Sequence, residues 1–369
     1  MNRAVGATVL AVVLLTASPP HRLTAQDSQY GIQGLGTPGR GESVRARSTG
    51  GAFAPFDAFS PLLEAPLADV RRLAAGVTLG TSWRTVDVAG TEASLRASRF
   101  PALVIAGPIT RRIVIAGGFG TYLDKSFGVL THDTIDIRGQ PVGVTDEITS
   151  DGAVADLRFA AAARVHSRLA VGVALHGLTG STRLAAVRTF DDSLYRTSTA
   201  REEIAYGGLG GSASALLDVT RDLRLAGWVR SDTKLTADVR GRTASTTDLP
   251  VAFGGGVRWR AGTEAVVAGA VAWRRWRGAG PDSHDTFSWS LGGEVGSVES
   301  PLRLGVRGGQ LPFGPGGRAP TEFGLAAGLG KQFSGGRGRL DFGLERLERK
   351  GGGLSERVWT FVLGLTVRP

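Results

Sequence analysis

Residues 358–368 read VWTFVLGLTVR, and this stretch decides the fold. Large apolar side chains occupy every second position, namely Trp359, Phe361, Leu363, Leu365 and Val367. The positions between them hold mainly smaller or polar side chains. A period of two residues is typical of a β-strand and excludes a helix. The stretch therefore predicts a strand with one oily face and one face of different character.

The same alternation recurs from about Arg71 to the end of the chain. Four further clear examples are residues 157–165, 169–175, 287–295 and 302–306. Fourteen such runs can be counted, most of about ten residues or more. Strands of soluble sheets usually have about 5–6 residues, whereas a tilted membrane strand needs about 9–11. A soluble sandwich would alternate in the same way, but the length of the runs favours a membrane barrel.

The connections between the runs alternate between short and long. Tight turns are expected at residues 107–111, 166–168, 220–222, 261–263, 299–301 and 334–337. Longer loops are expected at residues 124–149, 179–200, 231–248, 278–285, 309–320 and 350–355. Barrels of outer membranes have turns on one rim and loops on the other, and closure leaves no strand edge in the lipid. The sequence predicts an all-β fold, a 14-stranded antiparallel transmembrane β-barrel over residues 71–369, with an N-terminal plug.

The first 25 residues have the features of a secretory signal peptide. Arg3 precedes the apolar run 4–17, and Ala25 completes a small-residue cleavage site. The run is shorter than the roughly 20 residues that a spanning helix needs. The chain contains no cysteine, which excludes disulfides, thiolate zinc sites and cysteine nucleophiles. We expect an exported protein that resides in the cell outer membrane.

The formal net charge of +10 suits nucleic acid, anionic lipid or an acidic ligand, and does not choose among them. Residues 273–277 read WRRWR, a mixture of cations and aromatics that nucleic-acid sites share. In an exported barrel this mixture favours anchoring to lipid headgroups, with tryptophan at the interface. Trp83, Trp259, Trp273 and Trp276 are expected near strand ends, in an aromatic girdle.

Residues 26–70 lack the strand period. They are too few for an independent core, yet Phe53, Phe56 and Phe59 need burial. A barrel of this size encloses a lumen wider than side chains alone can fill. This segment is therefore predicted to fold into the lumen as a plug.

The segment also carries a resemblance to a known family. It contains Ser43, Arg45 and Arg47, then Gly-Gly-Ala-Phe at 50–53, Asp57 and Ser60. This pattern resembles the N-terminal hatch of the FadL family of outer-membrane transporters. The family usually has Asn-Pro-Ala in the hatch, where residues 63–68 here read LEAPLA, and the chain ends in Arg-Pro where such barrels usually end in an aromatic residue. The resemblance implies passive uptake of hydrophobic small molecules such as long-chain fatty acids.

Such a cargo would need an apolar pocket and a cation for its carboxylate. Phe53, Phe56 and Phe59 either line that pocket or pack the plug against the wall. Arginine suits a carboxylate because its planar fork binds two oxygens at once. The candidate ligand-binding residues are Phe53, Phe56, Phe59, Arg45, Arg47, Arg158 and Arg164. Other arginines expected on the lumen face are Arg224, Arg230, Arg303 and Arg307.

The alternative for these arginines is a structural network. Acidic side chains that could pair with them are Asp156, Glu294, Glu322, Asp341 and Glu345. Neither a Gly-x-Ser-x-Gly elbow nor a His-Glu-x-x-His helix is present, so we expect no enzyme, cofactor or metal. His176 and Ser181 make only a loose pair for hydrolysis.

The expected partners are a hydrophobic ligand, outer-membrane lipid, lipopolysaccharide and the barrel assembly machinery, for a monomer that binds no nucleic acid. Two other functions stay open. The chain could be a non-transporting barrel that serves as scaffold or shuttle for exported proteins, or a general diffusion porin.

Overall fold

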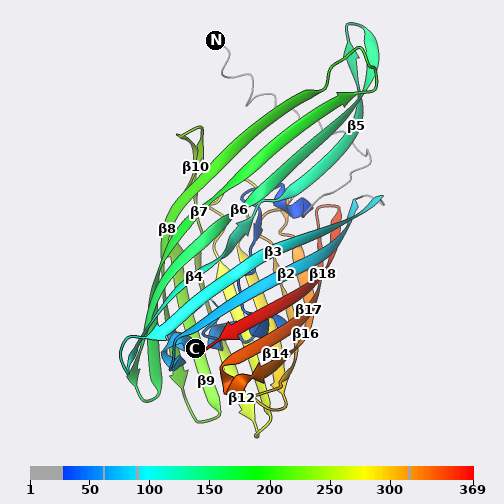
Figure 1. Cartoon of the computed structure of the whole chain (residues 1–369). Coiled ribbons are helices and arrows are strands. Elements are labelled where there is room, and N and C mark those ends of the chain that lie inside the picture. Colours follow the sequence, from blue (N-terminus) through cyan, green and yellow to red (C-terminus); the bar gives the residue numbers. More distant parts are fainter. Residues whose placement is uncertain (1–27, 61–62, 89–90, 315–316) are drawn as a thin grey trace.

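The computed structural model describes residues 28–60, 63–88, 91–314 and 317–369. The expected signal peptide, residues 1–25, lies outside the described residues. The chain forms a closed antiparallel barrel with 14 wall strands (Figure 1). The last wall strand pairs with the first, with Val367 opposite Ala75, which closes the sheet. The fold class predicted from the sequence is confirmed.

The wall strands follow one another around the barrel in chain order. They are β2 (Ala74–Val88), β3 (Thr91–Pro108), β4 (Ile113–Asp124), β6 (Gln140–His166), β7 (Leu169–Phe190), β8 (Ser198–Asp218), β9 (Leu223–Asp232), β12 (Val251–Ala261), β13 (Ala265–Arg274), β14 (Thr286–Val295), β15 (Leu302–Gln310), β16 (Thr321–Phe333), β17 (Gly338–Gly351) and β18 (Leu354–Val367).

Three additional strands extend the wall at one end. They are β5 (Phe127–Ile137), which pairs with the first part of β6, and the hairpin β10 (Lys234–Val239) with β11 (Arg242–Asp248), which pairs with β8. The predicted loops at 124–149, 179–200 and 231–248 are therefore wrong in their character, because most of their residues are paired strands. Polar residues beyond the bilayer can continue a ladder without an oily face, so alternation does not reveal them.

The two rims differ as expected. Six tight turns connect β3–β4, β6–β7, β8–β9, β12–β13, β14–β15 and β16–β17 at one rim, the turn rim. The start of β2 and the end of β18 lie at the same rim, and the turn before β17 includes the 3-10 helix η5 (Ser334–Gly336). The opposite rim, the loop rim, carries the extended strands (Figure 1). Turns face the periplasm in such barrels.

The two faces of the wall separate apolar from polar side chains. Phe159 and Leu175 point outward and are 70% and 71% exposed, whereas their neighbours Arg158 and His176 are buried in the lumen. This outward apolar band is the surface that lipid covers. Of the predicted girdle, Trp83 and Trp259 are exposed, but Trp276 is buried against Phe313. The expectation that Trp276 anchors headgroups is wrong, because it packs in a core beneath the loops.

Residues 28–60 and 63–70 occupy the lumen as the plug (Figure 1, blue). Its short elements are η1 (Gln29–Gly31), β1 (Thr37–Pro38), α2 (Val44–Ser48), η2 (Ala54–Phe56) and η3 (Ala65–Asp69). None of the helices in the described part of the chain is long and apolar enough to cross a membrane. The plug begins at the loop rim, where the Tyr30 hydroxyl donates to the carbonyls of Gly351 and Leu354. It ends at the turn rim, where Asp69 meets arginines of β6 and β9.

The ladder between β3 and β4 is incomplete. The two strands pair from Pro108 to Ala102 of β3, whereas residues 91–99 pair with β2 and have no partner on β4 among the described residues. Pro101 has no N–H to donate at the position where the ladder stops. β4 is irregular at the same height, at Tyr122, and there it pairs with β1 of the plug instead. The plug thus covers a strand edge that the wall leaves free.

Candidate functional site

The central helix of the plug, α2, is fixed by its own sequence. Ser43 is the N-cap, and its hydroxyl accepts a hydrogen bond from the backbone N–H of Ala46 at 3.1 Å. The hydroxyl of Ser43 donates in turn to the carboxylate of Asp57 at 2.5 Å. After the helix, Gly50 and Gly51 adopt φ values of 68° and 100°, which glycine tolerates best. The Ser43 and Gly-Gly positions of the hatch motif therefore shape a compact turn.

Glycines of the wall make room for this helix. A Cβ at Gly292 or Gly305 would overlap Thr49, and one at Gly328 would overlap the side chain of Ser48. A Cβ at Gly364 would lie 2.8 Å from Val44. Close packing of this kind leaves no space even for a methyl group. Part of the high glycine content thus serves contact between plug and wall.

Buried ion pairs join α2 to strands of the barrel wall. Arg45 donates its Nε to Glu294 of β14 at 2.8 Å, and Arg47 donates its Nε to Glu345 of β17 at 3.1 Å. Glu294 also accepts from Arg303, whose other nitrogen reaches Asp341 at 2.7 Å. Burial opposes the charge of Arg45, but the attraction of Glu294 outweighs it and raises the arginine's pKa. Arg45 is therefore charged at every physiological pH.

A second anchor lies at Glu64, which is fully buried. Ser212 donates its hydroxyl to Glu64 Oε1 at 2.7 Å, and Ser214 donates to Oε2 at 2.8 Å. His176 lies within hydrogen-bonding distance of both Ser212 Oγ, at 2.8 Å, and Asp156, at 2.9 Å. The chain Asp156–His176–Ser212–Glu64 links the β6–β8 wall to the plug.

The end of the plug is fastened at the turn rim. Asp69 pairs with Arg164 of β6 and with Arg224 of β9, the latter at 2.7 Å. The two arginines also pair with Asp218 of β8. The plug therefore has charged contacts at its end as well as at its middle.

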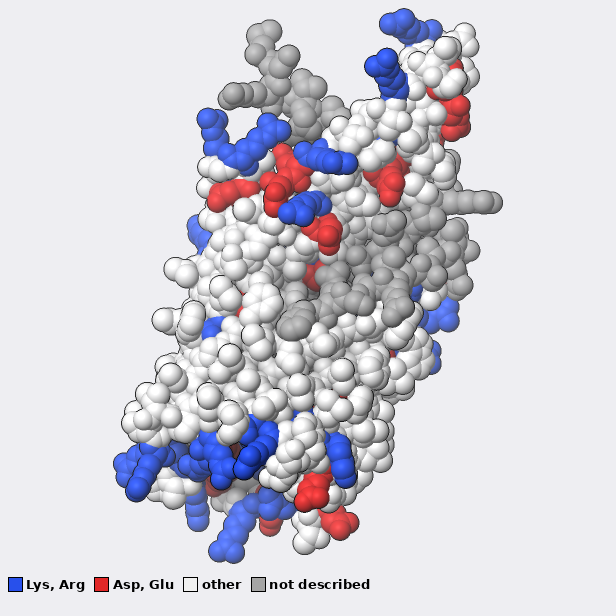
Figure 2. Space-filling view, in the orientation of Figure 1, with Lys and Arg blue, Asp and Glu red and all other residues white. Residues whose placement is uncertain are grey.

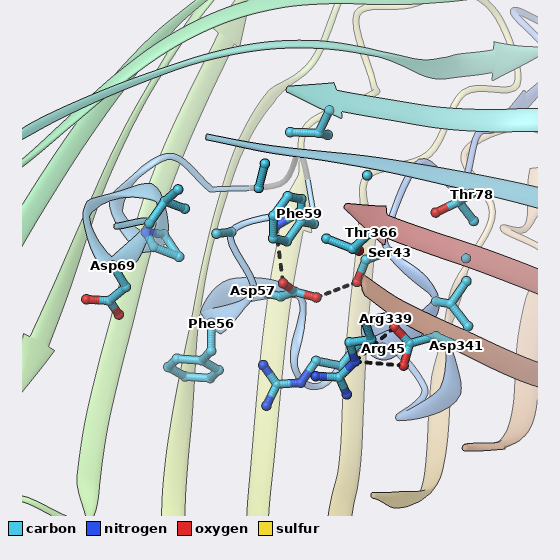
Figure 3. Close-up of a pocket in the computed structure, with 18 of the residues that line it drawn as sticks. Ser43, Arg45, Phe56, Asp57, Phe59, Asp69, Thr78, Arg339, Asp341 and Thr366 are labelled. Atoms are coloured by element: carbon cyan, nitrogen blue, oxygen red, sulfur yellow. Dashed lines mark hydrogen bonds and ion pairs between the residues drawn. The ribbon is translucent and has the colours of Figure 1, made fainter. Parts of the chain in front are cut away.

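A cavity of about 530 Å³ lies between the plug and the wall on the side of the turn rim (Figure 3). Its apolar lining includes Phe56 and Phe59 of the plug and Ala102 of β3. Seven arginines line it together with three aspartates, namely Arg45, Arg71, Arg72, Arg224, Arg258, Arg339 and Arg368 with Asp57, Asp69 and Asp341. The excess of cations makes the cavity attractive to an anion, and its two phenyl rings offer apolar contact.

Two of these arginines, Arg258 and Arg339, line the cavity from strands of the wall. The guanidinium of Arg258 lies 5.9 Å from the ring centre of Phe56, and no acceptor among the described residues bonds its Nε. Arg339 donates to Asp341 at 3.1 Å, and the pair is seen at the cavity edge in Figure 3. A carboxylate entering the cavity would complete the hydrogen bonding of Arg258.

The candidates predicted from sequence are distributed between this cavity and the anchors. Phe56, Phe59 and Arg45 line the cavity. Phe53 is fully buried, with the Arg45 guanidinium 5.0 Å from its ring centre. The remaining three candidates belong to plug anchors: Arg47 at Glu345, Arg158 beside Glu64, and Arg164 at Asp69. The structural network left open for the lumen arginines is present, with Asp156, Glu294, Glu322, Asp341 and Glu345 as its acceptors.

Sequence reasoning missed Arg258, Arg339 and Glu64. Arg258 and Arg339 stand on the lumen side of their strands, and each could have been found from the alternation of β12 and β17. Glu64 had no such signal, because the plug has no period. Among the described residues no group of His, Asp or Glu side chains is placed to hold a metal ion.

Comparison with known proteins gives likenesses of fold. No protein-family model matches the chain, and no curated protein matches it. A Pseudomonas aeruginosa FadL homologue superposes with a TM-score of 0.63 at 12% identity, covering 90% of this chain and 100% of the other. The monoaromatic hydrocarbon channel CymD gives 0.57 at 15% identity over 91% and 98%. The Pseudomonas putida toluene transporter TodX gives 0.57 at 13% identity over 91% and 98%.

These likenesses agree with the geometry. The closed wall, the outward apolar band and the lumenal plug define an outer-membrane β-barrel. The resemblance to FadL proteins that the hatch residues suggested is confirmed at the level of the fold.

Proposed function

We propose that this barrel is a passive outer-membrane channel for hydrophobic small molecules, with residues 26–70 as a movable plug in the barrel of residues 71–369. The observation that carries the proposal is the cavity beside the plug, with its phenyl rings and its arginines. Solved structures of similar fold include a monoaromatic hydrocarbon channel and a toluene transporter. An open diffusion porin would not need a buried plug with three charged anchors.

The finer proposal is that the cargo carries an acid group, as a long-chain fatty acid does. A neutral hydrocarbon has no use for an excess of arginines, whereas a carboxylate would bond Arg258 and the apolar remainder would contact Phe56 and Phe59. The cavity also reaches Ala102, where β3 parts from β4. We infer that cargo leaves the lumen through the wall at this break, once the plug segment at β1 moves.

The test is uptake into proteoliposomes of a fluorescent long-chain fatty acid and of a neutral aromatic hydrocarbon of similar bulk. We expect Arg258→Met to lower fatty-acid uptake by about tenfold and to leave hydrocarbon uptake nearly unchanged, as expected for loss of one charge-assisted hydrogen bond. Arg260→Met on the same strand is the matched control, because Arg260 does not line the cavity.

The alternatives give other results. A scaffold or shuttle would transport neither molecule and would co-purify with exported proteins. A diffusion porin would pass a hydrophilic sugar as fast as either cargo. If Arg258→Met lowered the uptake of both cargoes equally, the proposal that the cargo carries an acid group would be refuted. The proposal of a channel would stand.

A further inference from the structure

The turn rim carries an arc of exposed arginines over four adjacent connections. The arginine arc consists of Arg71, Arg72, Arg111, Arg112, Arg168 and Arg221. They lie before β2 and in the turns β3–β4, β6–β7 and β8–β9. The only acidic residue in the same connections is Asp222. Among the described residues none of the six arginine side chains has an ion-pair partner.

The arc lies directly beyond the apolar band of the wall. Leu73 is 54% exposed, and Ile109 and Val165 are each 60% exposed, at one to three residues from arginines of the arc. Figure 2 shows basic side chains gathered at the lower end of the molecule, where Figure 1 places the turn rim, with some acidic side chains beside them. The cations therefore stand at the depth where a lipid headgroup meets its acyl chains.

Six like charges on neighbouring turns repel one another unless anions come between them. The guanidinium fork binds two oxygens of a phosphate at once, and basic side chains at a membrane surface attract anionic lipids. An acidic soluble protein would satisfy the charges but leave the adjacent apolar side chains uncovered. A lipid satisfies both, because its phosphate meets the arginines and its chains meet the apolar band.

We propose that the arginine arc is a binding surface for anionic phospholipids of the periplasmic leaflet, held by their phosphate groups along β2 to β8. Arg71 and Arg72 of the arc also line the cavity beside the plug, whereas its other four arginines do not. The proposal stands whether or not the barrel transports. It assigns the lipid to one leaflet and to one side of the barrel.

The test is native mass spectrometry of the full-length protein in nanodiscs that contain equal amounts of phosphatidylglycerol and phosphatidylcholine with identical chains. We expect about fivefold or greater retention of phosphatidylglycerol over phosphatidylcholine. The variant Arg111→Gln/Arg112→Gln/Arg168→Gln is expected to lose this preference. The matched control, Arg275→Gln/Arg277→Gln/Arg318→Gln, removes the same charge from exposed positions at the loop rim and is expected to keep it.

Other outcomes overturn the proposal. Equal retention of both lipids by the wild type refutes the surface, and equal loss in both variants shows an effect of net charge alone. Displacement of phosphatidylglycerol by an equal concentration of glycerol 3-phosphate would show a site for free phosphate. Heat-modifiable migration in gels confirms that each variant has folded before its lipids are counted.

Discussion

Single side chains join the plug to the wall. Among them, Ser212 is the one whose removal has the most direct expected effect on stability. Ser212→Ala removes one of the two hydroxyl donors of the buried carboxylate of Glu64. We expect the free energy of unfolding to fall by about 1–3 kcal/mol, since a hydrogen bond to a buried charged group is lost. Thermal unfolding in detergent measures this change.

Ser181→Ala is the matched control for this prediction. Ser181 lies on the neighbouring strand, and its hydroxyl donates to Glu203 at an exposed position. It is expected to change stability by less than about 0.5 kcal/mol. Equal effects of the two substitutions would contradict the role assigned to the chain from Asp156 to Glu64.

Lys125 gives a pH-dependent prediction at the same scale. It lies between β4 and β5, with its Nζ 5.3 Å from the ring centre of Tyr206, and burial lowers its pKa from 10.5 to about 8. The folded protein releases this proton before the unfolded chain does, so stability rises between about pH 8 and pH 10.5. Lys125→Met is expected to raise the unfolding temperature at pH 7 and to remove that rise.

Unfolding temperatures in detergent from pH 7 to pH 11 decide the point. Lys331→Met is the control, because Lys331 is exposed at the turn rim. An unchanged pH profile in Lys125→Met would show that the burial of this ammonium group has no energetic consequence.

At the scale of elements, the packing of α2 against the wall depends on glycines of four wall strands. Gly305→Ala places a methyl group where the backbone of Thr49 lies, and the helix has to move. We expect a several-fold increase in single-channel conductance in planar bilayers, because a displaced plug admits ions. Gly227→Ala, where a Cβ would meet nothing within 4 Å, is expected to conduct as the wild type does. Identical conductance of both variants would show that α2 does not close the lumen.

The elements also show what sequence could and could not predict. The alternation in β18 was sufficient because lipid on one side imposes an apolar face, and Val358 and Val362 indeed lie buried opposite exposed Trp359 and Phe361. The first residues of β8, which read STAREE, extend beyond the lipid and carry no such pattern. The contacts between plug and wall could not be predicted from the sequence, because Arg45 and Glu294 are 249 residues apart and no local pattern relates them.

At the scale of the whole molecule, the plug fills the lumen that the closed wall surrounds. Deleting residues 30–67 removes β1, α2, η2 and the Glu64 anchor together. We expect ion conductance to rise by an order of magnitude or more, toward that of open porins. Planar-bilayer recordings measure it, with the purified variant first shown to be folded by its circular dichroism. Unchanged conductance would favour a lumen closed by the wall itself.

The tight seating of α2 against wall glycines has a consequence for biogenesis. Once β18 has paired with β2, the barrel is closed. A folded plug of about forty residues could then no longer enter the lumen through the wall. The plug, however, precedes every wall strand in the chain. We therefore expect the wall strands to close around a plug that is already in place, so that the wall glycines are needed during assembly as well as in the finished barrel.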